Sequence, residues 1–192
     1  MIRFNQSWCI QKPLPNDSVV GLPTLRVRDV SLGAVSKHLG QYQDVVERLC
    51  ALLHEQKYTL VSITNEFLQP GTGTCLDTGW HLDGRMVQDA PEHYALVCFG
   101  DDGARTMFCD VPFSGQIPVA PTTQEGRQQL FGRLMQRDLE NEAGGFEIPN
   151  GAPITYTTFD FHKGRRVLTA GRRILIRVMT SNLIRPKPFS LR

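Results

Sequence analysis

The sequence has no long apolar run, no strong charge of one sign and no cysteine spacing that indicates a metal or disulfide framework. No segment of its 192 residues approaches membrane-spanning length, and the start, Met1 to Gln6, has no apolar signal region. The five cysteines are an odd number without zinc-type spacing, which indicates free thiols in a reducing compartment. Repeats and low-complexity tracts are also missing. We therefore expect a cytoplasmic protein that does not enter a membrane.

The apolar content is enough for one hydrophobic core. Hydrophobic residues make up 41% of the chain, and a chain of 192 residues is long enough to bury such a core. We therefore predict a single domain over 1–192.

The net charge of +2 hides an uneven distribution, because the segment 161–192 contains nine Lys or Arg residues and no Asp or Glu. Its end, about 183–192, contains two prolines, and we predict a basic extended arm there. A solvated basic edge explains this composition more simply than nucleic-acid binding.

Apolar residues at helical spacing predict a helix over about 41–57, within a helical support over about 30–57. A β-branched run over 58–64 follows as a strand. Further along, 94–99 is predicted as a buried strand, 100–103 as a hairpin turn and 105–111 as the partner strand. A polar helix is expected over roughly 122–142.

Two strands are predicted near the carboxyl end of the chain. The segment 154–161 is a strand by composition and places His162 at its end. In the segment 172–178, alternation places Arg173, Leu175 and Arg177 on one face and the aliphatic residues between them on the other. Two arginines on an inward face are costly unless an anion meets them, and a dicarboxylate would be such an anion.

The segment Trp80-His81-Leu82-Asp83 contains a His-x-Asp pair. Residues two apart on a strand point to the same side, so His81 and Asp83 can offer an imidazole nitrogen and a carboxylate oxygen to one ion. His162 completes a set of two imidazoles and one carboxylate. Such a set suits non-haem Fe(II), although zinc with a bound water also accepts these ligands.

Taken in order, these features resemble the Fe(II)/2-oxoglutarate-dependent dioxygenase superfamily, whose fold is a double-stranded β-helix (jelly roll, cupin-like). Its motif combines His-x-Asp, a distal His and an Arg on the next strand. By this resemblance the metal ligands are His81, Asp83 and His162, and the fold is mainly β with flanking helices.

The resemblance also implies a site for the cosubstrate. The arrangement of His162-Lys163-Gly164 and Gly171-Arg172-Arg173 matches the family's, which favours Arg173 as the residue that binds the far carboxylate of 2-oxoglutarate. Arg172 and Arg177 remain alternatives for this role. The segment 103–108 resembles a Gly-x-x-Thr-x-Phe strand of several members, which makes Thr106 a candidate cosubstrate contact.

The implied activity is hydroxylation or demethylation with Fe(II) as cofactor and 2-oxoglutarate as small-molecule cosubstrate. The prime substrate is left open between a small molecule, a nucleic acid and a protein, and the sequence does not predict the oligomeric state. Two alternatives from other classes are a non-catalytic jelly-roll binding or structural protein and a zinc-dependent hydrolase.

Overall fold

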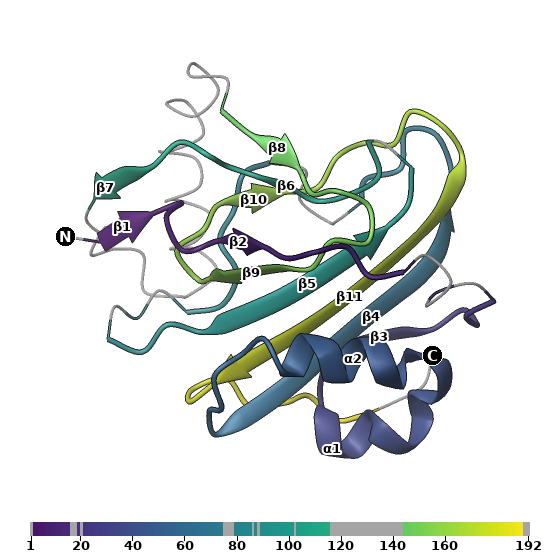
Figure 1. The fold of residues 1–192 in the computed structure, drawn as a ribbon, viewed down its shortest axis with the longest axis horizontal. Helices are drawn as coiled ribbons and strands as arrows, with labels where there is room; N and C mark the ends of the chain where they lie inside the picture. The colour runs from purple at the N-terminus through teal and green to yellow at the C-terminus, as the bar shows by residue number, and fades with distance from the viewer. Residues whose placement is uncertain are drawn as a thin grey trace.

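The computed structural model describes residues 2–15, 19, 21–74, 79–85, 87, 89–101, 103–115 and 144–189. The protein is mainly β, as predicted, and its largest sheet has six antiparallel strands (Figure 1). Their order across the sheet is β2 (Cys9–Ile10), β9 (Ile154–Thr157), β5 (His93–Phe99), β11 (Gly171–Ser181), β4 (Tyr58–Leu68) and β3 (Arg26–Ser31). The predicted strands at 58–64 and 94–99 are therefore present, with β4 longer than expected.

A second, smaller sheet lies above the first in Figure 1. It contains three antiparallel strands in the order β10 (His162–Lys163), β6 (Met107–Phe108) and β8 (Phe146–Glu147). An isolated bridge between His81 and His162 adds the His-x-Asp segment beside β10. At one side, β1 (Ile2–Phe4) pairs with β7 (Phe113–Gly115).

The chain alternates between the six-stranded and the three-stranded sheet. After β4 in the six-stranded sheet it passes the His81 bridge beside β10, and it then returns to the six-stranded sheet as β5. Strands β6 and β8 lie in the three-stranded sheet, β9 in the larger one, β10 in the smaller one and β11 in the larger one again. The side chains between the two sheets therefore come from segments far apart in the sequence.

Helices cover the outer face of the six-stranded sheet (Figure 1). These are α1 (Leu32–Val35), the 3₁₀ turns Ser36–His38 and Gly40–Tyr42, and α2 (Gln43–Cys50). The predicted helix over 41–57 thus ends at Cys50. Its last turn tightens, because the amides of Leu52 and Leu53 bond to carbonyls three residues back.

Strand β11 carries the alternation that the sequence predicts. Ile174, Ile176 and Val178 belong to the core cluster under the helices, whereas Leu175 packs into a separate core cluster on the opposite face. Arg177 contacts Asp83 on that opposite face. The interior between the two sheets therefore receives the arginine-bearing face of β11.

Leu49 of α2 is fully buried in the cluster under the helices. Leu49→Ala is expected to lower the free energy of unfolding by about 2–5 kcal/mol, because it leaves a cavity against the sheet. Urea unfolding measures this change. The matched control is Leu52→Ala, since Leu52 is 37% exposed just after the helix; an equal loss in the two variants would contradict the packing described.

The predicted hairpin of 94–99 with 105–111 is wrong. Strand β5 lies between β9 and β11, and β6 pairs with β10 and β8 instead. The turn is held against the segment that contains Glu147 and Ile148. The Arg105 guanidinium donates hydrogen bonds to the Gly100 and Ile148 carbonyls, and the Glu147 carboxylate accepts hydrogen bonds from the amides of Gly103 and Arg105. These contacts direct the chain to the smaller sheet.

The predicted strand over 154–161 is also too long. Strand β9 ends at Thr157, and the Asp160 carboxylate accepts hydrogen bonds from the amide and hydroxyl of Thr157 and from the Ser7 amide. This turn carries the chain from one sheet to the other, so His162 begins a separate strand, β10. A short polar residue that satisfies local amides favours such a turn over a continuous strand.

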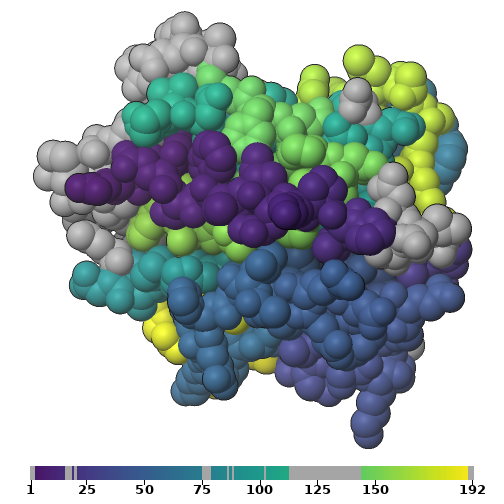
Figure 2. All heavy atoms as spheres, viewed as in Figure 1, coloured from purple at the N-terminus to yellow at the C-terminus, as the bar shows by residue number. Residues whose placement is uncertain are grey.

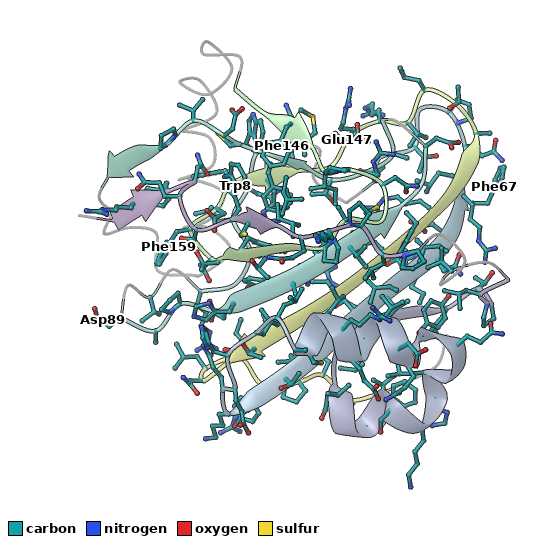
Figure 3. The ribbon with its side chains drawn as sticks, viewed as in Figure 1. Trp8, Phe67, Asp89, Phe146, Glu147 and Phe159 are labelled. Carbon is teal, nitrogen blue, oxygen red and sulfur yellow. The ribbon has the colours of Figure 1, made fainter. Side chains whose placement is uncertain are left out.

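The N-terminal segment and the basic arm both lie along the domain. In Figure 2 the first residues, in purple, cross the visible face between the helical segment and the segment around residue 150, and Trp8 lies beside Phe146 with ring centroids 4.8 Å apart (Figure 3). The arm, described as far as Phe189, runs beside β3, since the Lys187 amide bonds to the Asp29 carbonyl. Phe67 points outward and is 64% exposed (Figure 3).

The sequence also led to predictions about the segment 122–142, about membrane-spanning helices and about the cysteines. The helix expected over roughly 122–142 lies outside the described residues. Within the described part of the chain, no helix is long and apolar enough to cross a membrane. Cys9, Cys50, Cys98 and Cys109 are free thiols, and Cys98 and Cys109 are buried.

Candidate metal centre

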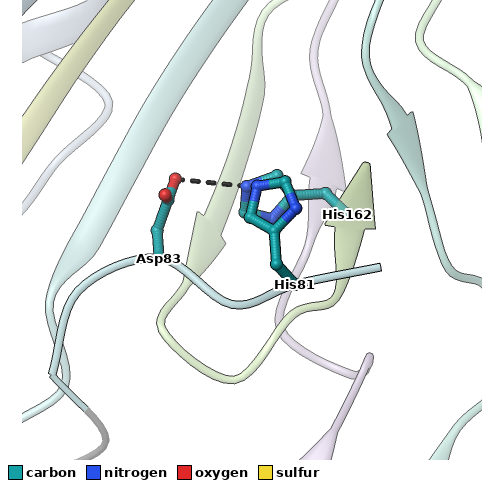
Figure 4. A group of neighbouring side chains, drawn as sticks. All are labelled: His81, Asp83 and His162. Atoms are coloured by element: carbon teal, nitrogen blue, oxygen red, sulfur yellow. Dashed lines mark ion pairs between the residues drawn. The ribbon is translucent and has the colours of Figure 1, made fainter. Parts of the chain in front are cut away.

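The His-x-Asp pair and the distal histidine meet at the bridge between the 81 segment and β10. The His81 amide donates to the His162 carbonyl at 2.9 Å, and the His162 amide donates back to the His81 carbonyl at 3.1 Å. This reciprocal pairing sets the two rings side by side, with centroids 4.6 Å apart. Asp83, two residues beyond His81, faces the same point (Figure 4).

The three side chains can hold a metal ion. One ligand atom from each of His81, Asp83 and His162 lies within 4.8 Å of the others. The set contains two imidazole nitrogens and one carboxylate oxygen, as the sequence predicts. His162 is 5% exposed, whereas His81 and Asp83 are half-buried, so the cluster is accessible from one side.

Backbone carbonyls orient both imidazoles. His81 Nδ1 lies 2.9 Å from the Gly79 carbonyl oxygen, and His162 Nδ1 lies 3.1 Å from the Asp160 carbonyl oxygen. Because a carbonyl oxygen only accepts hydrogen bonds, each Nδ1 carries the hydrogen, and a neutral ring then has its lone pair on Nε2. This arrangement is typical of metal-binding histidines, whose second nitrogen donates to a carbonyl or carboxylate.

The Asp83 carboxylate is held in the charged form. Its Oδ2 accepts a hydrogen bond from Arg177 Nη1 at 2.6 Å and one from the Tyr156 hydroxyl at 3.0 Å. Burial by itself would raise the pKa of Asp83, but the Arg177 guanidinium and the His162 ring outweigh it and hold that pKa well below its usual value. Asp83 is thus an ionised ligand at neutral pH.

The close approach of Asp83 and His162 leaves room for a proton or a metal ion between their facing atoms. His162 Nε2 lies 3.2 Å from Asp83 Oδ2, the pair joined by the dashed line in Figure 4. If Nδ1 carries the only ring hydrogen, two lone pairs face one another at this distance, which is unfavourable. A second ring proton or a metal ion removes the repulsion.

The three candidate arginines have different surroundings. Arg177 lies between two carboxylates, because it also contacts Asp29 at 3.0 Å, and these neighbours raise the pKa of Arg177 above its usual value despite its burial. Arg172 points outward, where it donates to the Asn65 side chain and to the Leu22 carbonyl. Both guanidinium groups therefore already have partners in the protein.

Arg173 is 3% exposed, and its Nε donates to the Ala104 carbonyl at 2.8 Å. Among the described residues, no carboxylate forms an ion pair with it. A buried cation without a neutralising group is unfavourable, so Arg173 is the arginine that most needs an anionic ligand.

Thr106 lies near Arg173 in the structure. The Cys98 thiol is buried, which raises its pKa, and it contacts both the Arg173 guanidinium and the Thr106 amide. Thr106 precedes β6, whose Phe108 is paired with His162. Arg173 on β11 and Thr106 beside β6 therefore contact the same thiol, and β6 is the strand that pairs with His162 of β10.

Sequence reasoning missed Tyr156 and Asp29 as neighbours of the centre. Tyr156 lies on β9, in a segment that the sequence indicated only as a strand by composition. Asp29 lies in a β-bulge of β3 with a φ of 53°. A bulge redirects a side chain, and no pattern in the sequence indicates it.

Glu92 fixes the loop that follows Asp83. It is 1% exposed, and its Oε2 accepts hydrogen bonds from the Arg85 amide at 3.0 Å and the Thr158 hydroxyl at 2.5 Å. Its Oε1 is buried and has no hydrogen-bond partner in the part of the chain that the structure describes. Burial raises the pKa of Glu92 above its usual value, although these hydrogen bonds oppose the shift.

This shift predicts a pH dependence of stability. Because the folded state holds the Glu92 proton more tightly than the unfolded state, stability falls as pH rises above the unfolded pKa of 4.5, until the folded pKa is passed. Glu92→Gln lacks this loss, so its stability relative to wild type should rise as the pH increases from 4.5. Denaturant unfolding at several pH values measures the difference. A gain that does not vary with pH would show that Glu92 titrates normally.

Scans against protein-family models and searches of curated proteins and of solved structures give no match to this chain.

Proposed function

We propose that this protein is an Fe(II)- and 2-oxoglutarate-dependent dioxygenase that hydroxylates or demethylates its prime substrate. The observation that carries the proposal is the meeting of His81, Asp83 and His162 within 4.8 Å. Two imidazoles and one carboxylate on one side of an ion leave the opposite positions open for a cosubstrate and O2.

The donor set fits Fe(II). Both histidines have Nδ1 directed at a carbonyl oxygen, which leaves Nε2 as the ligand atom. Asp83 supplies one negative charge, so the ion keeps a net positive charge that attracts an anionic cosubstrate.

We also propose that the fold is a jelly roll. In a jelly roll, antiparallel strands form two facing sheets, and here the chain alternates between a six-stranded and a three-stranded sheet from β4 to β11. The bridge at His81 gives the smaller sheet its fourth segment. The alternation supports the double-stranded β-helix that the motifs indicate.

Arg173 is the proposed partner of the far carboxylate of 2-oxoglutarate. It is buried on the same strand as Arg177, and no described carboxylate neutralises it. A guanidinium can bind a carboxylate through two parallel hydrogen bonds, which fixes position as well as charge. Thr106, on the neighbouring segment, is proposed as a second contact.

When bound, iron with 2-oxoglutarate supplies the oxidation: one atom of O2 enters succinate as CO2 is lost, and the other enters a C–H bond of the substrate. The protein's residues order the reactants. The Gly79 and Asp160 carbonyls orient the imidazoles, and Arg177 with Tyr156 holds one oxygen of Asp83. Arg173 orients the cosubstrate.

An anaerobic titration tests the proposal. Metal-free protein receives Fe(II) and then 2-oxoglutarate, and we expect a visible metal-to-ligand charge-transfer band that requires both. Zn(II) with 2-oxoglutarate is the control, since zinc binds the same ligands without such a band. Tight metal binding without the band would favour the hydrolase, and absence of metal binding would favour a non-catalytic role.

A further inference from the structure

An open cleft of about 680 Å³ lies on the Asp83 side of the candidate metal centre. Its size is that of a pocket for a small ligand, which is typically 300–1,000 Å³. Candidate metal ligand Asp83 and its partner Arg177 form part of the wall, so a molecule in the cleft lies beside one residue of the proposed iron site.

Three further arginines line this cleft, and each comes from a different segment. Arg28 lies on β3, Arg85 in the loop after Asp83, and Arg185 in the basic arm. All three are exposed. Among the described residues, no carboxylate forms an ion pair with the side chains of Arg85 and Arg185, whereas Arg28 forms one with the neighbouring Asp29, at 3.6 Å.

The two aspartates of the cleft share their charge with other cations, so they do not balance the arginines that line it. Asp83 is paired with Arg177, and Asp29 is paired with Arg177 at 3.0 Å and with Lys187 at 3.1 Å. The cleft therefore keeps an excess of positive charge, which would attract an anion.

The remaining wall is apolar and contains one polar group without a partner. Met179, Leu183 and Ile184 contribute apolar surface. Tyr94 also lines the cleft, and its buried hydroxyl has no hydrogen-bond partner among the described residues. Gly84 leaves space beside that hydroxyl, because a Cβ there would lie 2.3 Å from it.

We infer that the prime substrate carries a phosphate group, which Arg28, Arg85 and Arg185 bind while an organic part extends toward Asp83. Guanidinium groups bind phosphate oxygens in pairs and are favoured for this purpose over other cations. The inference rests on the proposed dioxygenase, since it places the substrate beside the same metal. The phosphate belongs either to a small phosphate ester or to a nucleic-acid strand.

Binding to metal-free protein tests the inference separately from the iron chemistry. The probes are a fluorescein-labelled oligomer of eight thymidines and unlabelled pyrophosphate as its competitor. The triple variant Arg28→Gln/Arg85→Gln/Arg185→Gln should bind the oligomer at least about tenfold more weakly than wild type, with a shallower salt dependence. The control variant Lys12→Gln/Lys37→Gln/Arg48→Gln removes three exposed charges outside the cleft and should bind as wild type does.

The outcomes decide both the inference and the source of the phosphate. Displacement of the oligomer by micromolar pyrophosphate supports a small phosphate ester, and retention of the oligomer supports a nucleic-acid strand. Equal binding by wild type and the cleft variant, or displacement by 2-oxoglutarate alone, would overturn the inference. The charge-transfer band of the cleft variant is measured in parallel, and its presence would leave the dioxygenase proposal intact.

Discussion

Replacing His162 with alanine is expected to weaken Fe(II) binding by more than about 100-fold and to remove the charge-transfer band with 2-oxoglutarate. Loss of a group that only orients a ligand already costs 10–100-fold in affinity, and loss of the ligand itself costs more. His162 is the most buried of the three ligands, so water replaces it poorly. Anaerobic calorimetry with Fe(II) measures the affinity.

The control for His162→Ala is His54→Ala, which removes an imidazole at an exposed position outside the cluster. Thermal unfolding of metal-free protein shows whether His162→Ala still folds. If the variant misfolds, His162→Gln keeps a polar side chain of similar size between Phe108 and Tyr156, the rings that contact His162. Wild-type iron affinity in a folded variant at this position would rule out the proposed centre.

The cluster of His81, Asp83 and His162 could be predicted because each part has a local pattern. A His-x-Asp pair at strand spacing places two ligands on one side, and the alternation in 172–178 identifies an inward face with arginines. Both patterns depend on the period of a strand, which is independent of the rest of the fold. Only the position of His162 beside His81 required the motif order of a family.

The partners of the strands could not be predicted in the same way. The apolar run 94–99, the turn at 100–103 and the segment after it indicate a hairpin by every local rule. Arg105 and Glu147, 42 residues apart, decide otherwise, because their hydrogen bonds close the turn and send β6 to the other sheet. Local sequence does not contain that long-range contact.

The same limit applies to the surroundings of Asp83. Its partners Arg177 and Tyr156 lie 94 and 73 residues away, and the cleft is lined by β3, the loop after Asp83 and the C-terminal arm. The sequence indicated inward arginines on 172–178 but did not indicate that the arm after it contributes Arg185 to this cleft. The resemblance favoured Arg173 over Arg172 and Arg177 for the far carboxylate, but it did not indicate the neighbours of any of the three.

The second large effect is expected at Arg173, which forms no ion pair with a described carboxylate. Arg173→Ala is expected to raise the 2-oxoglutarate concentration needed for the charge-transfer band by about 100-fold, with Fe(II) affinity unchanged. The reason is that truncating one side of a buried, hydrogen-bonded charge pair costs about 2–5 kcal/mol. Arg173→Lys should recover part of the loss, because it keeps the charge but lacks the planar pair of donors.

Arg172→Ala is the matched control, since it removes a guanidinium one position away on the outward side of β11. It should leave the 2-oxoglutarate dependence unchanged and should lower stability through the lost contacts with Asn65 and Leu22. Arg177→Ala should instead weaken iron binding, because Arg177 holds Asp83. The separation of the three effects identifies the carboxylate-binding residue, and a cosubstrate defect confined to Arg177→Ala would assign that role to Arg177 in place of Arg173.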